Sequence, residues 1–154
     1  DDLLTAVDAM LPPRWSRNNP VDLAGGETRE TIPELLDMVA GHPGVDSVVQ
    51  LGLGIQGNTA ALTRSGPFHP DHGLERIVDF HERQERRYAE AAADASTTHG
   101  KPVLVASELA VTQPDNPMVA AVRGTDRLCY PSADRAVAAL GHLVRYASWR
   151  RARA

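Results

Sequence analysis

The sequence contains a single cysteine, Cys129, among its 154 residues. An internal disulfide is therefore excluded, and such cysteine usage is typical of a reducing compartment, so we expect a cytoplasmic protein. No apolar run approaches the roughly 18 residues that a transmembrane helix needs, so no membrane span is expected. Sixteen basic against twenty acidic residues give a net charge of −4, and this balance favours neither nucleic acid nor an anionic membrane as a partner.

The first ten residues, DDLLTAVDAM, lack an initiator methionine and also the basic start of a signal peptide. We therefore expect a fragment or a processed chain. Apolar residues make up 42% and charged residues 23%, as in an ordinary globular protein, and the length suits one domain over residues 1–154.

Helical and strand patterns alternate along the chain. Short apolar strands are predicted at residues 45–52, 102–107 and 127–131, and helices at 3–11, 31–41, 73–98, 116–124 and 133–147. Residues 52–72 are expected to form a loop with a short helix near 59–63. Alternation of this kind predicts a three-layer α/β domain with a mainly parallel sheet, whose ligand crevice lies at the carboxyl ends of the strands.

Local signals refine two of these helices. Thr31 and Glu34 predict a capping box, and Gly41 predicts a left-handed end to the same helix. In the long helix, the segment ERQERR (residues 82–87) is interpreted as part of a solvated face.

The stretch LGLGIQGN carries glycines at 52, 54 and 57, in the pattern G-x-G-x-x-G. Dinucleotide binding is disfavoured because the loop does not open the domain and TRSGPFHPDHG soon breaks the following segment. The acidic residues about 20 positions further on, Asp71 and Glu75, also lie in a loop and a helix start and not at the end of a strand. Two interpretations stay open. The loop holds an anionic group on its backbone N–H groups, or it is a tight turn that packs closely against its neighbours.

Other polar groupings give weaker signals. His81 and Glu85 lie one helical turn apart and could share a metal, but a packed histidine bonded to a neighbour is favoured. Ser107 and Glu108 end the second strand without a nearby histidine, so a hydrolase triad is not supported. We expect no catalytic residue and no metal ligand in this chain.

Four stretches together resemble one family. These are LPPRWSRNNPVDLAGG, GVDSVVQLGLGIQGN, GKPVLVASELA and RLCYPSADRAVAALGHLVRYASWR, in this order and over nearly the whole chain. They are similar to segments of NDP-forming acyl-CoA synthetases, the relatives of succinyl-CoA synthetase. The resemblance implies the second flavodoxin-like ligase domain of such an enzyme, without its first strand and glycine pair.

The family's reaction joins an acid and CoA at the expense of an NTP, through an acyl phosphate and a phosphohistidine. The family's phosphohistidine follows an S-H-T-G type motif that none of the six histidines here matches. The resemblance therefore implies an inactive part that contributes an interface near the phosphohistidine and CoA site. CoA, ATP or ADP, and Mg belong to the presumed full-length enzyme, and no cofactor is expected on this part.

The partners implied are the CoA-binding and ATP-grasp domains, and a neighbouring segment or a second copy of the chain is expected to cover the sheet edges left open. The alternatives are a non-catalytic acyl-CoA-binding or regulatory module of the same fold, and a stand-alone domain with an unrelated ligand. For Asn19 and Asp22, turn and cap chemistry is the favoured interpretation, because short polar side chains bond to nearby backbone groups. The candidate residues of the ligand rim are Asn19, Pro20, Asp22, Gly52, Gly54, Gln56, Gly57, Asn58 and Glu108.

Overall fold

The computed structural model describes residues 2–25 and 28–153. Its centre is a parallel sheet in the order β1-β2-β3, formed by β1 (Val48–Gln50), β2 (Val103–Ala106) and β3 (Cys129–Tyr130). Val48 pairs with Val103 across the first two strands, and Val105 pairs with Cys129 across the last two. The predicted α/β class and parallel pairing are confirmed.

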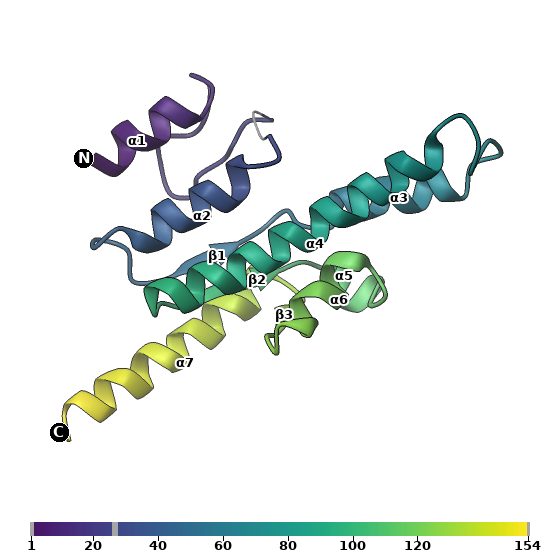
Figure 1. Ribbon diagram of the computed structural model, residues 1–154. Coiled ribbons are helices and arrows are strands. Elements are labelled where there is room, and N and C mark those ends of the chain that lie inside the picture. The colour runs from purple at the N-terminus through teal and green to yellow at the C-terminus, as the bar shows by residue number, and fades with distance from the viewer. Residues whose placement is uncertain (1, 26–27, 154) are drawn as a thin grey trace.

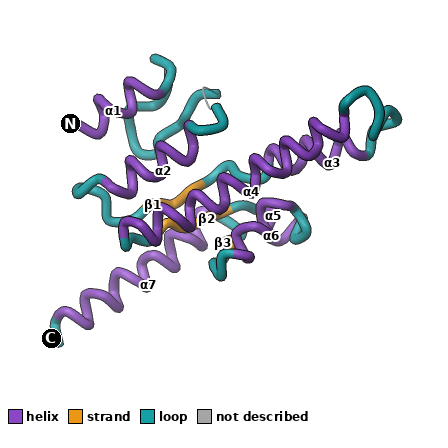
Figure 2. The backbone as a smooth tube through the Cα atoms, in the orientation of Figure 1, coloured by secondary structure: helices purple, strands orange, loops and turns teal. Residues whose placement is uncertain are grey.

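Helices cover both faces of this sheet (Figures 1 and 2). The long helix α4 (Leu74–His99) and α6 (Pro117–Gly124) pack together on one face, and α7 (Ala133–Arg151) lies against the other. Between β1 and α4 the chain forms α3 (Ile55–Arg64), which runs back along α4 as a helical hairpin. The short α5 (Leu109–Thr112) follows β2.

The N-terminal part adds a smaller apolar cluster beside this core. Helix α1 (Asp2–Met10) and α2 (Thr31–Gly41) enclose Val7, Leu11, Trp15 and Leu35. Trp15 donates its indole N–H to the Asp8 carboxylate at 2.8 Å, which satisfies its polar group. The main cluster lies between α4, the sheet and α6, around Tyr88, Met118 and Val119.

Two details of α2 differ from the prediction. The N-cap is Glu30 and not Thr31, whose hydroxyl instead accepts a hydrogen bond from the Thr28 amide, so no capping box forms. Gly41 is the last helical residue and is not left-handed. A Cβ at Gly41 would lie 3.0 Å from the His99 ring, so close approach, rather than backbone conformation, explains the glycine.

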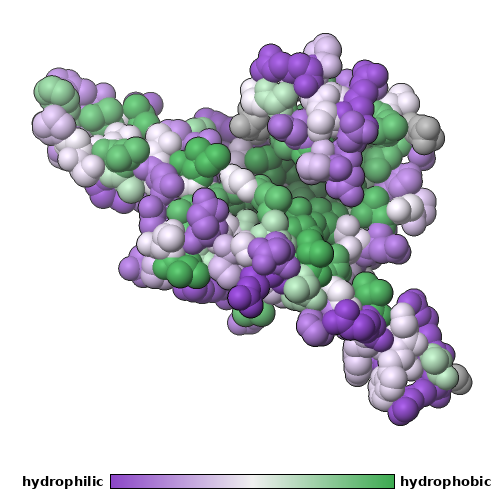
Figure 3. Space-filling model, turned by 180° about the vertical axis from the view of Figure 1, so that it is seen from behind, coloured by the Kyte–Doolittle hydropathy of each residue, from purple (hydrophilic) through white to green (hydrophobic). Residues whose placement is uncertain are grey.

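The sheet and α7 are incompletely covered. Within the described residues β1 pairs only with β2, so its other edge has no strand partner. Helix α7 has 19 residues, yet only Ala136 is buried, and its C-terminal half runs away from the body (Figure 1). From behind, hydrophobic side chains gather in a hollow between the α1–α2 part and α7 (Figure 3). In residues 2–25 and 28–153, no helix is long and apolar enough to span a membrane.

Candidate functional site

The carboxyl ends of the three strands meet at one edge, and Ser107 ties them together. Its backbone N–H donates to the carbonyl of Tyr130, the last residue of β3, at 2.8 Å, and its hydroxyl donates to the Leu53 carbonyl after β1 at 3.2 Å. The same hydroxyl accepts from the Leu109 amide at 3.3 Å. The glycine loop after β1, the start of α5 and the end of β3 therefore form one surface, which we call the carboxyl edge.

The N–H groups of the glycine loop bind a carboxylate of the chain itself. Glu85, on the middle of α4, accepts from the Gln56 amide at 2.7 Å and from the Gly54 amide at 3.0 and 3.1 Å. Its side chain is only 1% exposed. A carboxylate at the first turn of α3 satisfies free N–H groups and interacts favourably with the helix dipole. Of the two interpretations of the loop, the tight turn packed against its neighbours fits the structure, and the N–H groups expected to hold an anionic ligand bind Glu85 of the chain itself.

This contact explains two differences from the predicted structure. Helix α3 begins at Ile55, four residues before the predicted short helix, because Glu85 caps it from a distant part of the sequence. The segment at residues 82–87 is not a uniformly solvated face, since Gln84 and Glu85 are buried. The Gln84 amide donates to the Arg29 carbonyl at 3.1 Å, so both polar residues have partners.

The loop glycines are required by geometry. Gly54 has φ 105°, and a Cβ there would lie 2.1 Å from the Leu109 side chain. A Cβ at Gly57 would lie 2.9 Å from the Asn116 side chain, which in turn accepts from the Met118 amide and caps α6. Gly52 has φ 78° with open space around it. The G-x-G-x-x-G spacing therefore combines left-handed backbone with close packing.

Burial controls the acid–base behaviour of Glu85. Removal of the carboxylate from water raises the pKa of Glu85, and the backbone N–H groups of Gln56, Gly54 and Gly57 oppose this increase by stabilising the charged form. The net direction is upward, so the folded protein holds the proton of Glu85 more tightly than the unfolded chain does.

A cleft of about 420 Å³ opens beside the glycine loop. It lies between α3 and the turn from α5 to α6, with Gly57, Arg64 and Glu82 on one side and Thr112–Pro117 on the other. Arg64 donates to Glu82 at 2.7 Å. Asp115 also lines the cleft, so beside the Arg64–Glu82 ion pair the lining carries one further acid and no further cation.

The structure brings together most, but not all, of the predicted rim. Gly52, Gly54, Gln56, Gly57 and Asn58 lie on the carboxyl edge. Gln56 also bonds through its side chain to Nδ1 of His81, which is the neighbour-bonded histidine that the sequence favoured. Asn58 accepts from the Asn116 amide at 3.5 Å, a long contact. Glu108 is exposed at the start of α5.

Asn19, Pro20 and Asp22 lie elsewhere, in the connection between α1 and α2. The Ser16 hydroxyl donates to the Pro20 carbonyl at 2.7 Å and accepts from the Asp22 amide at 2.9 Å, and the Asp22 carboxylate accepts from the Ala24 amide at 2.9 Å. These are turn contacts, as the alternative interpretation predicted. Among the described residues, no hydrogen bond joins this segment to the glycine loop.

Sequence reasoning missed the roles of Glu85, Asn116, Arg64 and Glu82. Two of these had a detectable signal. Glu85 stands in the middle of a helix in line with apolar neighbours such as Val78 and Tyr88, and Asn116 directly precedes a proline that opens a helix, which is typical of an N-cap. Across the part of the chain that the structure describes, no group of three or more His, Cys, Asp or Glu side chains could hold a metal.

The fold thus defines an α/β protein with a short parallel sheet and a self-capped glycine loop at its carboxyl edge. Comparisons with protein-family models, with curated proteins and with solved structures give no match to this chain.

Substitution of Gly54 by alanine should strongly destabilise the protein. The left-handed backbone costs an alanine about 1–2 kcal/mol, and the clash with Leu109 adds about 1–3 kcal/mol. Urea denaturation should therefore show a loss of about 2–4 kcal/mol. Gly124→Ala is the matched control, because a Cβ there meets nothing within 4 Å and φ is not positive. Equal stability of the two variants would contradict the geometry.

Glu85→Gln should change the pH dependence of stability. A glutamine oxygen can accept from Gly54 and Gln56 but carries no charge. Because the folded pKa of Glu85 is raised, wild-type stability is fully present below the unfolded pKa and declines as the pH rises through the folded pKa. The stability of Glu85→Gln relative to wild type should therefore increase from acid to neutral pH, with a slope of at most about 1.4 kcal/mol per pH unit.

Urea denaturation of both proteins between about pH 4 and pH 8 measures the difference in their free energies of unfolding. This range begins near the ordinary glutamate pKa and extends above it. Glu90→Gln, at an exposed position on the same helix, should show no such slope. If the stability of Glu85→Gln relative to wild type stayed constant or fell as the pH rises, ionising Glu85 in the folded state would carry no free-energy cost.

Proposed function

We propose that this chain is a domain of an NDP-forming acyl-CoA synthetase, related to succinyl-CoA synthetase, and that it corresponds to the second flavodoxin-like ligase domain. One observation carries the proposal most directly. The four resembling stretches fall, in order, on the segment before α2, on β1 with its glycine loop, on β2, and on β3 with α7, and the three strands are parallel.

The carboxyl edge supports a non-catalytic role within such an enzyme. Its loop N–H groups are occupied by Glu85, so they do not offer a free phosphate site. What the edge presents outward is Glu108 and the cleft next to Arg64 and Glu82. We therefore propose that this edge forms an interface near the phosphohistidine and CoA site. The phosphohistidine would come from the other flavodoxin-like ligase domain, and the CoA-binding and ATP-grasp domains would be the further partners. CoA, the nucleotide and Mg would bind to the assembled enzyme.

The self-capped loop and the adjoining cleft also favour one alternative, a non-catalytic module of the same fold that binds an acyl-CoA or regulates a partner. A flavodoxin-like domain with an unrelated ligand is the third candidate. These functions differ in whether the isolated chain binds CoA and in whether the chain is needed for turnover.

The test uses the complete gene product that contains this chain. If the proposal is right, its sequence carries an S-H-T-G histidine and an ATP-grasp region, and the protein forms NDP only when acid, CoA and NTP are all present. The isolated chain should give no turnover and no saturable heat when CoA is added in a calorimeter. Saturable CoA binding by the isolated chain would favour the module, and a gene without either motif would refute the enzyme.

We also propose that a partner covers the open edge of β1, either another domain of the synthetase or a second copy of this chain. Val48 donates its N–H to the Pro102 carbonyl at 2.9 Å. Because successive residues of a strand face opposite edges, the N–H of Val49 faces the open one. An unpaired edge beside an apolar hollow is a surface that proteins normally cover.

The isolated chain should therefore self-associate in size-exclusion chromatography with light scattering, and the assembled fraction should increase with concentration. Val49→Pro removes the outward N–H at an edge position that tolerates proline, so it should weaken assembly while the circular dichroism spectrum is kept. A well-folded wild-type monomer at every concentration would contradict a second copy as the cover, and a monomeric complete gene product that still exchanges the Val49 amide freely would contradict any cover of this edge.

A further inference from the structure

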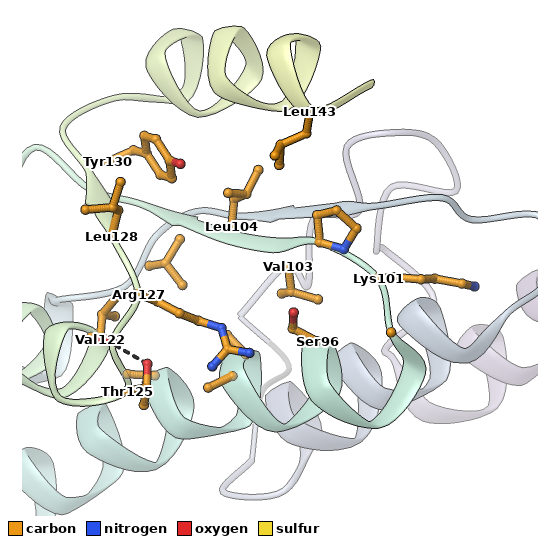
Figure 4. Close-up of a pocket in the computed structure, with 16 residues that line it drawn as sticks. Ser96, Lys101, Val103, Leu104, Val122, Thr125, Arg127, Leu128, Tyr130 and Leu143 are labelled. Carbon is orange, nitrogen blue, oxygen red and sulfur yellow. Dashed lines mark hydrogen bonds between the residues drawn. The ribbon is translucent and has the colours of Figure 1, made fainter. Parts of the chain in front are cut away.

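A second hollow lies away from the carboxyl edge, where β3 separates from β2. Because β3 pairs only with Val105 and Ala106, the N-terminal half of β2 has no strand on that side. The space left is a groove of about 430 Å³, with α4 on one side and α7 on the other (Figure 4). It shares no lining residue with the cleft at the carboxyl edge. Its volume is in the range of about 300–1,000 Å³ typical of ligand sites.

The floor of this groove is apolar, and so is its mouth. Ala92 of α4, Val103 of β2 and Val122 of α6 are buried along the floor. At the mouth, Leu128 lies on the β3 segment beside Tyr130 and Leu143 extends from α7 toward Leu104 (Figure 4), and they are 70% and 47% exposed. Large aliphatic side chains exposed at a concave site favour an apolar occupant, since covering them removes hydrocarbon surface from water.

The charge of the groove has one sign. No aspartate or glutamate is among its lining residues, which include Lys101 and Arg127. The Lys101 ammonium donates to the His42 carbonyl at 2.7 Å and points away from the groove in Figure 4. Arg127 extends into the groove toward Ser96, and its guanidinium donates to the Thr97 hydroxyl at 3.1 Å. Among residues 2–25 and 28–153, no carboxylate forms an ion pair with Arg127.

We propose that this groove binds a small monocarboxylic acid with an apolar tail. The carboxylate lies on the guanidinium of Arg127, whose planar fork fits a carboxylate through two parallel hydrogen bonds. The tail lies on Val103 and Val122 and covers Leu128 and Leu143. A single guanidinium in an otherwise apolar groove matches one negative charge. The inference stands on the groove alone and does not depend on the proposed function.

Octanoate is a suitable probe, and 1-octanol is its uncharged match in chain length. Titration of the isotope-labelled chain, followed by amide NMR shifts, should give saturable octanoate binding with a Kd at or below about 1 mM. The shifts should centre on Ser96, Val103 and Leu128. Octanol should bind at least about tenfold more weakly, because it cannot form the charged pair with Arg127.

Three variants complete the experiment. Arg127→Met keeps the aliphatic stem and removes the charge, and Leu128→Asp places a negative charge at an exposed position of the mouth. Each should weaken octanoate binding about tenfold or more. Arg86→Met, at an exposed position outside the groove, is the matched control and should bind as wild type does.

The inference is overturned if octanoate shows no saturable shifts, if octanol binds as tightly, or if Arg127→Met binds like the control. Shifts centred on the carboxyl edge instead of the groove would overturn it as well. None of these results bears on the proposed synthetase role, which is tested by CoA and by turnover of the complete gene product.

Discussion

The carboxylate of Glu85 organises the part of this molecule where its strands end. It is buried on the longest helix and accepts hydrogen bonds from the N–H groups of Gly54 and Gln56, 29 to 31 residues earlier in the chain. A buried carboxylate without such donors would be strongly unfavourable, and the first turn of α3 without an acceptor would lose its cap. The carboxylate and the N–H groups therefore satisfy each other's hydrogen-bonding needs, and these bonds hold α3 against α4.

The same contact gives a physical meaning to the glycine loop. Loops of this spacing are known for bringing backbone N–H groups close to an anion, and here that chemistry is present with the anion supplied from within the chain. Gly54 and Gly57 are needed because Leu109 and Asn116 approach the backbone too closely for a Cβ. Because Glu85 occupies the loop N–H groups, the loop connects α3 to α4 and leaves these groups unavailable to a phosphate. For this reason we propose an interface role for this edge and no phosphate binding.

The remaining surface is less complete than the carboxyl edge. In the part of the chain that the structure describes, one side of β1 has no strand, β3 pairs with only part of β2, and half of α7 extends from the body with its apolar residues uncovered. Isolated helices of this length are marginal in water, so α7 gains most of its support from what packs against it. The groove beside Arg127 and the hollow behind the sheet are both consequences of the short strands, and each is a surface that an added molecule could fill.

From the sequence alone, the periodicity of apolar residues predicted the strands and the long helix, because these depend on neighbours within a few positions. The alternation of strands and helices predicted parallel pairing. The tight glycine turn was also predictable. The capping of α3 and the burial of Gln84 and Glu85 were not, because each is decided by a partner that is distant in sequence. The missing capping box at Thr31 has a local cause, since the Thr31 hydroxyl accepts from the Thr28 amide instead. The amino-acid order determined which segments are helix and strand. Only the tertiary structure decided that a glutamate within a charged run turns inward, since the donors that offset its burial come from another part of the chain.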